Sequence, residues 1–344
     1  MQVWSRKRWV QRAIRLERST VDAQRRMRPS RSLALALPGL AAAAFLHRYR
    51  RAVEERSASR CDIPALAGRV RIVPTNWGRL SYRFVLGADP GPPLLLVHGW
   101  GRSADSVWWR LLAHTRRTVV AVDLPGHGRS TLQTRFSFEL AAEAVQMAIE
   151  DAGVVRPALV GHSMGGPIAL TAVRRSTPHA FTGLIVVASS AFWVRPRHQL
   201  KVAAAPYVLG PNSPVTMRRQ RVEEMLDPDQ ARMIAWEYAV RPQRQIMEES
   251  AAELRRFDAR AWTDFRLPPA LWIVTSDDGV ISPADQRASA ALLQVPAVEV
   301  PFDHRLTTDA APRVGEVIEA AVREWSAHPP YGIRARAQRT RALG

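Results

Sequence analysis

Apolar positions fall into short runs along the chain, separated by polar segments with helical spacing. Two early runs, residues 70–73 and 80–86, alternate apolar and polar side chains as half-buried antiparallel strands do, with a turn at residues 76–78 between them. The later runs are almost entirely apolar, which is typical of strands buried on both faces of a parallel sheet. These later runs span residues 93–97, 119–122, 158–160, 184–188, 270–274 and 298–300.

Helical periodicity separates most of these runs, over residues 138–152, 167–175, 283–293 and 312–325. A regular alternation of strands and helices favours a parallel sheet with helices on both faces and right-handed crossovers. The chain has no internal repeats. We therefore predict an α/β fold with a doubly wound, mostly parallel sheet.

The alternation stops once, between residues 192 and 267, where only helical segments interrupted by prolines occur. We interpret this insertion as a helical lid, because it begins near the carboxyl end of a strand, where open α/β sheets bind ligands. Its aromatic residues, Trp193, Trp236 and Tyr238, fit an apolar substrate channel and a packed helical core equally well. The predicted lid helices span residues 217–225, 229–238 and 244–257. The full predicted division is an N-terminal extension (1–65), a core (66–191 and 268–327), the lid (192–267) and a basic C-terminal tail (328–344).

The N-terminal extension is basic and contains an uncharged run over residues 33–46. This run is shorter than the roughly 20 residues that a membrane-spanning helix needs, and Pro38 and Gly39 interrupt it. Three interpretations stay open: a basic helix on an anionic membrane surface, a cleaved signal peptide, and a helical extension that packs on the main domain. We expect a cytoplasmic protein, with an anionic membrane surface as the hypothetical partner of residues 1–60.

The net charge of +18 in 344 residues raises the question of nucleic-acid binding. Residues 1–60 hold 15 Lys and Arg against 4 Asp and Glu, so +11 of the excess precedes the core. Lys7 and Lys201 are the only lysines, which indicates a compositional bias toward arginine rather than selection for phosphate contacts. We expect no nucleic-acid partner. The single Cys61 excludes an internal disulfide framework, and no Cys/His pattern predicts a metal site.

The most informative stretch surrounds Ser163. An apolar strand over residues 157–160 leads into it, and residues 168–173 leave it at helical spacing. Gly161 and Gly165 flank the serine, which is expected where a sharp strand-to-helix turn leaves no room for a Cβ. Such a turn holds the hydroxyl above a helix N-terminus, where negative charge is stabilised. The pattern predicts a serine nucleophile.

Three motifs together give the chain a resemblance to the α/β-hydrolase family, over roughly residues 66–326. They are G-H-S-M-G-G at residues 161–166, L-V-H-G-W-G at residues 96–101 and D-L-P-G-H-G-R-S at residues 123–130. The order of nucleophile, acid and histidine along the chain is also that of the family.

The resemblance implies a role for several further groups. The family's general base follows the last core strand, and His304 lies there. The backbone N–H groups of Trp100 and Met164 are the expected donors to the oxyanion that forms when Ser163 attacks a carbonyl. The side chain of Trp100 either shapes the acyl pocket or packs in the core.

The acid is expected after a strand, within reach of the histidine. The strand over residues 184–188 is followed by two serines and offers no carboxylate. After the next strand, alignment on the V-I-S-P segment places the acid at Asp278, and Asp277 stays as the alternative. Thr275 stands where the family usually has a glycine.

A serine at position 163 argues against the epoxide hydrolases and dehalogenases of this fold, which use an aspartate there. We therefore expect a serine hydrolase, of the carboxylesterase or lipase type, that cleaves a small-molecule ester of an apolar acyl group without a cofactor. The alternatives are an acyltransferase, a C–C hydrolase, a cofactor-free haloperoxidase and a non-catalytic binding protein of the same fold.

Overall fold

The computed structural model describes residues 66–177, 179–193, 240, 242–262, 266–306 and 310–327. The N-terminal extension and the C-terminal tail lie outside these residues, and so does most of the predicted lid. The hypotheses on residues 33–46, on a membrane surface, on the helices at 217–225 and 229–238 and on Trp236 and Tyr238 therefore fall outside the described residues.

A mixed, mostly parallel sheet of nine strands organises the described part of the chain, as predicted. The strand order is β1-β2-β4-β3-β6-β7-β8-β9, and the short β5 pairs with β2. Contacts among β1, β2, β4 and β5 are antiparallel, and all others are parallel. The strands are β1 (Arg69–Thr75), β2 (Gly78–Val85), β3 (Asp89–Val97), β4 (Arg117–Asp123), β5 (Thr131–Leu132), β6 (Ala158–His162), β7 (Gly183–Val187), β8 (Ala270–Thr275) and β9 (Ala297–Val300).

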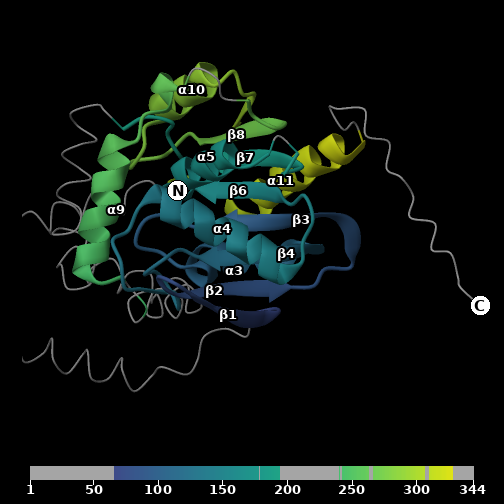
Figure 1. Ribbon diagram of the computed structural model, residues 1–344. Helices are drawn as coiled ribbons and strands as arrows, with labels where there is room; N and C mark the ends of the chain where they lie inside the picture. Colours follow the sequence, from purple (N-terminus) through teal and green to yellow (C-terminus); the bar gives the residue numbers. More distant parts are fainter. Residues whose placement is uncertain are drawn as a thin grey trace, which may run out of the picture. The chain divides into compact units, whose positions relative to one another are not determined.

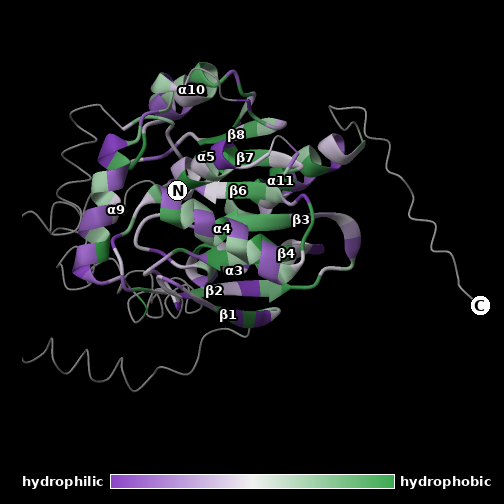
Figure 2. Cartoon of the chain, viewed as in Figure 1, coloured by the Kyte–Doolittle hydropathy of each residue, from purple (hydrophilic) through white to green (hydrophobic). Residues whose placement is uncertain are grey.

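Helices cover both faces of this sheet. One face packs against α4 and α5 and the other against α3 and α11, with α4 and α11 on opposite sides of the sheet in Figure 1. Figure 2 shows that hydrophobic residues concentrate on the central strands between these layers, where burial is complete. The helices are α3 (Ala104–His114), α4 (Phe138–Ala152), α5 (Gly165–Arg175), α9 (Arg244–Arg256), α10 (Pro283–Leu292) and α11 (Ala310–Ala327), with a 3-10 turn η1 (Ala259–Ala261).

The pattern of apolar positions did not predict α3. This helix begins with a reciprocal cap in which the side chains of Ser103 and Ser106 each accept a hydrogen bond from the other residue's backbone N–H. The usual signature of such a cap has Glu or Gln at the second position, so a serine pair is easily missed. Val107, Trp108 and Leu111 are spaced so that they lie on one face of the helix, and this face is buried against the sheet.

The helix expected over residues 244–257 is present as α9, which crosses one end of the strands in Figure 1. Its apolar side packs on the loops that follow β3 and β4. A Cβ on Gly101 would lie 2.9 Å from Met247, and one on Gly126 would lie 3.1 Å from Ile246. The helix therefore covers the carboxyl ends of two parallel strands, where open sheets of this kind bind ligands.

None of the described helices is both long and apolar enough to cross a bilayer.

Candidate active site

The turn between β6 and α5 has the strained geometry that the glycine pattern predicts. Ser163 lies at its apex with a φ of 54°, in the left-handed region that non-glycine residues rarely adopt. A Cβ on Gly161 would lie 2.3 Å from the carbonyl oxygen of Gly165, and a Cβ on Gly165 would lie 2.3 Å from that of Val97. Backbone therefore fills the space on both sides of the turn and holds the serine in place.

Three side chains from distant parts of the chain meet at this turn. His304 Nε2 lies 2.9 Å from Ser163 Oγ, and His304 Nδ1 lies 2.8 Å from Asp278 Oδ2. Because an ionised carboxylate only accepts, Nδ1–H donates to Asp278, and Nε2 is left to accept from the serine hydroxyl. Asp277, the alternative acid, is exposed and lies within 3.5 Å of Ser276 Oγ instead.

Two backbone N–H groups hold the Oδ1 oxygen of the Asp278 carboxylate. The N–H groups of Val280 and Ile281 donate to Oδ1 at 2.7 and 2.9 Å. Burial raises the pKa of this carboxyl, but the hydrogen bond and charge attraction from His304, together with these N–H donors, outweigh burial and leave the pKa below its ordinary value. The geometry therefore favours an ionised Asp278.

Two side chains that were not predicted to belong to the site hold Oδ2, the second carboxylate oxygen of Asp278. Thr275 Oγ1 and Gln286 Nε2 each donate to Asp278 Oδ2 at 2.9 Å, in addition to His304. Thr275, which departs from the family's usual glycine, thus contributes a hydroxyl to the carboxylate of Asp278. Gln286 is fully buried on α10, and its Oε1 accepts from the Thr275 N–H. A glutamine in the buried stripe of a helix is the sequence signal that could have identified it.

His162 holds the loop that carries His304. Its Nε2–H donates to the backbone carbonyl of His304 at 2.8 Å, and its ring lies against the edge of Trp108. His98 connects two other loops, since its Nδ1–H donates to the Gly99 carbonyl and its Nε2 accepts from the Leu124 N–H. Both imidazole rings are buried, and their hydrogen bonds connect loops rather than transfer protons.

Acid is expected to destabilise the fold through three buried histidines. Burial lowers the pKa of His162 to about 3, that of His127 to about 4, and that of His98 well below its ordinary value. Below pH 6.5 the unfolded chain binds protons that the folded chain does not, so the stability present above pH 6.5 is lost as the pH falls toward 4. The expected loss is about 1.4 kcal/mol per pH unit for each histidine. Burial raises the pKa of Asp123 to about 6, so this carboxyl takes up a proton in the folded state as the pH falls from 6 to 4 and offsets about one histidine. The net loss in that range is therefore about 3 kcal/mol per pH unit.

Urea unfolding at intervals between pH 7.5 and 4.5 measures this loss. His127→Gln is expected to reduce the slope between pH 6 and 4.5 by about half, because three histidines less the opposing Asp123 leave a net difference of about two protons, and one of them is removed. A free energy of unfolding that stays constant from pH 7 to 5 would contradict the neutral, buried state of these rings.

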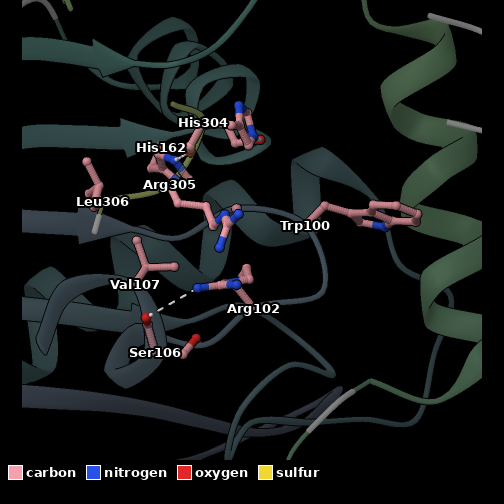
Figure 3. Close-up of a pocket in the computed structure, with 10 residues that line it drawn as sticks. Trp100, Arg102, Ser106, Val107, His162, His304, Arg305 and Leu306 are labelled. Atoms are coloured by element: carbon pink, nitrogen blue, oxygen red, sulfur yellow. Dashed lines mark hydrogen bonds between the residues drawn. The ribbon is translucent and has the colours of Figure 1, made fainter. Parts of the chain in front are cut away.

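The loop after β3 lies directly against Ser163. A Cβ on Gly99 would lie 3.0 Å from Ser163 Cβ, and the N–H of Trp100 follows immediately. Within the described residues, neither this N–H nor that of Met164 donates a hydrogen bond. The Trp100 indole points away toward α9, where Nε1–H donates to Ser250 Oγ at 2.9 Å (Figure 3). This side chain therefore anchors α9 to the loop while also bordering the pocket.

A pocket opens above Ser163 and His304. Its described lining combines apolar side chains, Val107 and Leu306, with two guanidinium groups, Arg102 and Arg305 (Figure 3). Among the residues that the structure describes, no group of three His, Cys, Asp or Glu side chains is arranged to hold a metal ion.

Comparisons with known proteins agree with this architecture. A family model for the alpha/beta hydrolase fold matches residues 92–304. A crystal structure of a hydrolase from Pseudomonas aeruginosa superposes with a TM-score of 0.61 at 22% identity, over 74% of this chain and 98% of that one. At that level of identity the likeness concerns the fold alone.

Sequence relatives match over shorter stretches. A pimeloyl-[acyl-carrier protein] methyl ester esterase from Sodalis glossinidius is 42% identical over 101 residues, 28% of this chain and 36% of that protein. The dihydrolipoyllysine-residue acetyltransferase component of an acetoin cleaving system from Pseudomonas putida is 38% identical over 117 residues, 33% of this chain and 31% of that protein. The chain thus spans about a third of the length of each of these two relatives.

Proposed function

The chain belongs to the α/β-hydrolase fold family, and on that premise we propose that it is a serine hydrolase that cleaves a carboxylic ester of an apolar acyl group through an acyl-enzyme intermediate. The observation that carries the proposal is the continuous hydrogen-bonded series from Ser163 through His304 to Asp278. A serine hydroxyl is a weak nucleophile alone, and this arrangement supplies both the base and the group that orients it.

In the proposed reaction, His304 Nε2 takes the hydroxyl proton as Ser163 Oγ attacks the ester carbonyl carbon. The resulting oxyanion accepts from the N–H groups of Trp100 and Met164, and loss of one such donor typically raises the barrier by about 3 kcal/mol. The C–O bond then breaks, and His304 gives its proton to the leaving alcohol. Water, deprotonated by the same ring, attacks the acyl-enzyme and releases the acid and the free serine.

Asp278 supports both half-reactions. It accepts from Nδ1–H and so keeps Nε2 unprotonated and aimed at Ser163 before each proton transfer. It also stabilises the imidazolium that forms when the ring takes a proton.

Val107 and Leu306 in the pocket lining support an apolar acyl group. The relative from Sodalis glossinidius is named as a methyl ester esterase, which makes esters of small alcohols the first substrates to test.

Labelling with a fluorophosphonate probe tests the proposal. An activated Ser163 is expected to form a covalent adduct that mass spectrometry locates on its peptide, and ester substrates are expected to slow labelling by competition. A series of p-nitrophenyl esters from C2 to C16 then measures the acyl preference. A folded protein that neither labels nor hydrolyses any of these esters would favour the non-catalytic binding protein instead.

A further inference from the structure

Gln286 is a fully buried polar side chain on α10, the helix beside β8 in Figure 1, and it faces Asp278. Its amide contacts two backbone groups: Oε1 accepts from the Thr275 N–H at 3.0 Å, and Nε2 donates to the Ile281 carbonyl at 2.9 Å. Because an N–H only donates and a carbonyl only accepts, these two groups leave one orientation for the amide. Gln286 therefore turns Nε2 toward Asp278 and joins the end of β8 to the loop that follows it.

One oxygen of the Asp278 carboxylate, Oδ2, receives three side-chain donors. Gln286 Nε2 and Thr275 Oγ1 each lie 2.9 Å from it. Thr275 donates, because an ionised carboxylate only accepts, and its own oxygen accepts from Gln286 Nε2 at 3.0 Å. His304 Nδ1–H is the third donor, at 2.8 Å. The oxygen that orients His304 is thus held by two side chains that are not among the described residues lining the pocket.

Hydrogen bonds to Oδ1 alone would leave the carboxylate free to turn about that atom. The N–H groups of Val280 and Ile281 hold Oδ1, whereas Oδ2 is the oxygen that contacts His304. A turn of the carboxylate would move Oδ2 away from Nδ1 and would release the ring that presents Nε2 to Ser163. A displacement of about 1 Å in such an arrangement can reduce a rate about 100-fold. Donors to Oδ2 from β8 and from α10 oppose this turn.

We propose that Gln286 and Thr275 are positioning residues of the hydrolase, which hold Asp278 Oδ2 at the place where it keeps His304 aimed at Ser163. The inference rests on the proposed function and extends its machinery to α10, a helix whose side chains here act through Asp278 rather than on the substrate. A glycine, which the family usually has at position 275, could not supply the hydroxyl.

The hydroxyl is tested by two substitutions of Thr275. Thr275→Val removes the hydroxyl and keeps the branched side chain, and it is expected to lower kcat on a p-nitrophenyl ester about tenfold, with a smaller change in KM. Thr275→Ser keeps the hydroxyl and is expected to recover most of this loss. The matched control is Thr182→Val. The Thr182 hydroxyl donates to the Arg156 carbonyl just before β7, at the other end of the parallel strands, and its loss is expected to leave kcat unchanged.

The amide is tested by Gln286→Met, which keeps the length of the side chain and removes both polar atoms. Two backbone groups then lose their partner, so a loss of stability accompanies the catalytic effect. Ser289→Ala is the control for stability: Ser289 is equally buried one turn later on α10 and accepts from the Ala191 N–H rather than contacting Asp278. With urea unfolding to show that both variants are folded, Gln286→Met is expected to lower kcat about 10- to 100-fold and Ser289→Ala less than about twofold.

Combination with Asp278→Ala shows whether the two residues act through the carboxylate. With Oδ2 removed, Gln286→Met and Thr275→Val are each expected to change the rate less than about twofold further. The rate measured is that of fluorophosphonate labelling, followed by mass spectrometry of the Ser163 peptide, because spontaneous ester hydrolysis does not contribute to it.

The outcomes separate this inference from the proposed function. Wild-type kcat in Thr275→Val, no recovery in Thr275→Ser, or equal losses in Gln286→Met and Ser289→Ala would overturn the positioning role and leave the serine hydrolase in place. Losses of the same size with and without Asp278 would also overturn it. If Gln286→Met did not fold, the two Thr275 variants would decide. Failure of the wild type to label and to hydrolyse any ester would instead reject the proposed function, and this inference with it.

Discussion

Replacing Ser163 with alanine is expected to lower kcat for ester hydrolysis by about a million-fold and to remove fluorophosphonate labelling. The substitution deletes Oγ, the atom that attacks the carbonyl in the proposed reaction and lies 2.9 Å from His304 Nε2. Alanine keeps the Cβ, so the backbone strain at a φ of 54° is the same in both proteins and the fold is expected to persist. Initial rates on a p-nitrophenyl ester, with circular dichroism to check folding, measure the effect.

The matched control for this prediction lies at the other end of α5. Ser176 follows the last residue of that helix, and its hydroxyl donates to the Ala172 carbonyl. Ser176→Ala removes a hydroxyl of the same kind away from the pocket and is expected to leave the rate near that of the wild type. If purified Ser163→Ala kept more than about one hundredth of the activity, another nucleophile would have to carry the reaction.

The second large effect is expected from Asp278→Asn, which should lower kcat by about 10,000-fold. The N–H groups of Val280 and Ile281 require an acceptor at the Oδ1 position, so the asparagine carbonyl oxygen is expected to stay there. The amide NH2 then faces His304 Nδ1 and donates to it. The proton of the neutral ring moves to Nε2, which can no longer take the proton of Ser163.

Asp277→Asn provides the comparison, since it is the same chemical change one residue earlier. Asp277 is exposed and does not contact His304, so the rate is expected to change by less than twofold, in the range typical of surface substitutions. Steady-state kinetics on one ester measures both variants. If Asp277→Asn showed the larger loss, the acid of the site would have to be reassigned.

Local patterns were sufficient for most of the architecture. Fully apolar runs predicted β3, β6, β7 and β8 because a strand buried on both faces has no polar side to alternate with. The turn at Ser163 was equally predictable, since two glycines and an apolar strand constrain the backbone within a few residues. The helix α3 was missed because its cap uses a pair of serines, and the two-residue β5 is too short for any pattern.

The amino-acid sequence by itself therefore determined the parallel sheet and the sharp turn at Ser163, and it limited the expected acid to a pair of neighbouring aspartates. Only the tertiary structure shows that Asp278 rather than Asp277 contacts His304, because neighbouring loop residues differ in direction and that direction is set by contacts with other segments. It alone also brought Gln286 to Asp278, Trp100 to α9, and Arg102 and Arg305 to one pocket. Each of these contacts joins side chains whose meeting depends on how strands and loops pack rather than on the spacing between them in the chain.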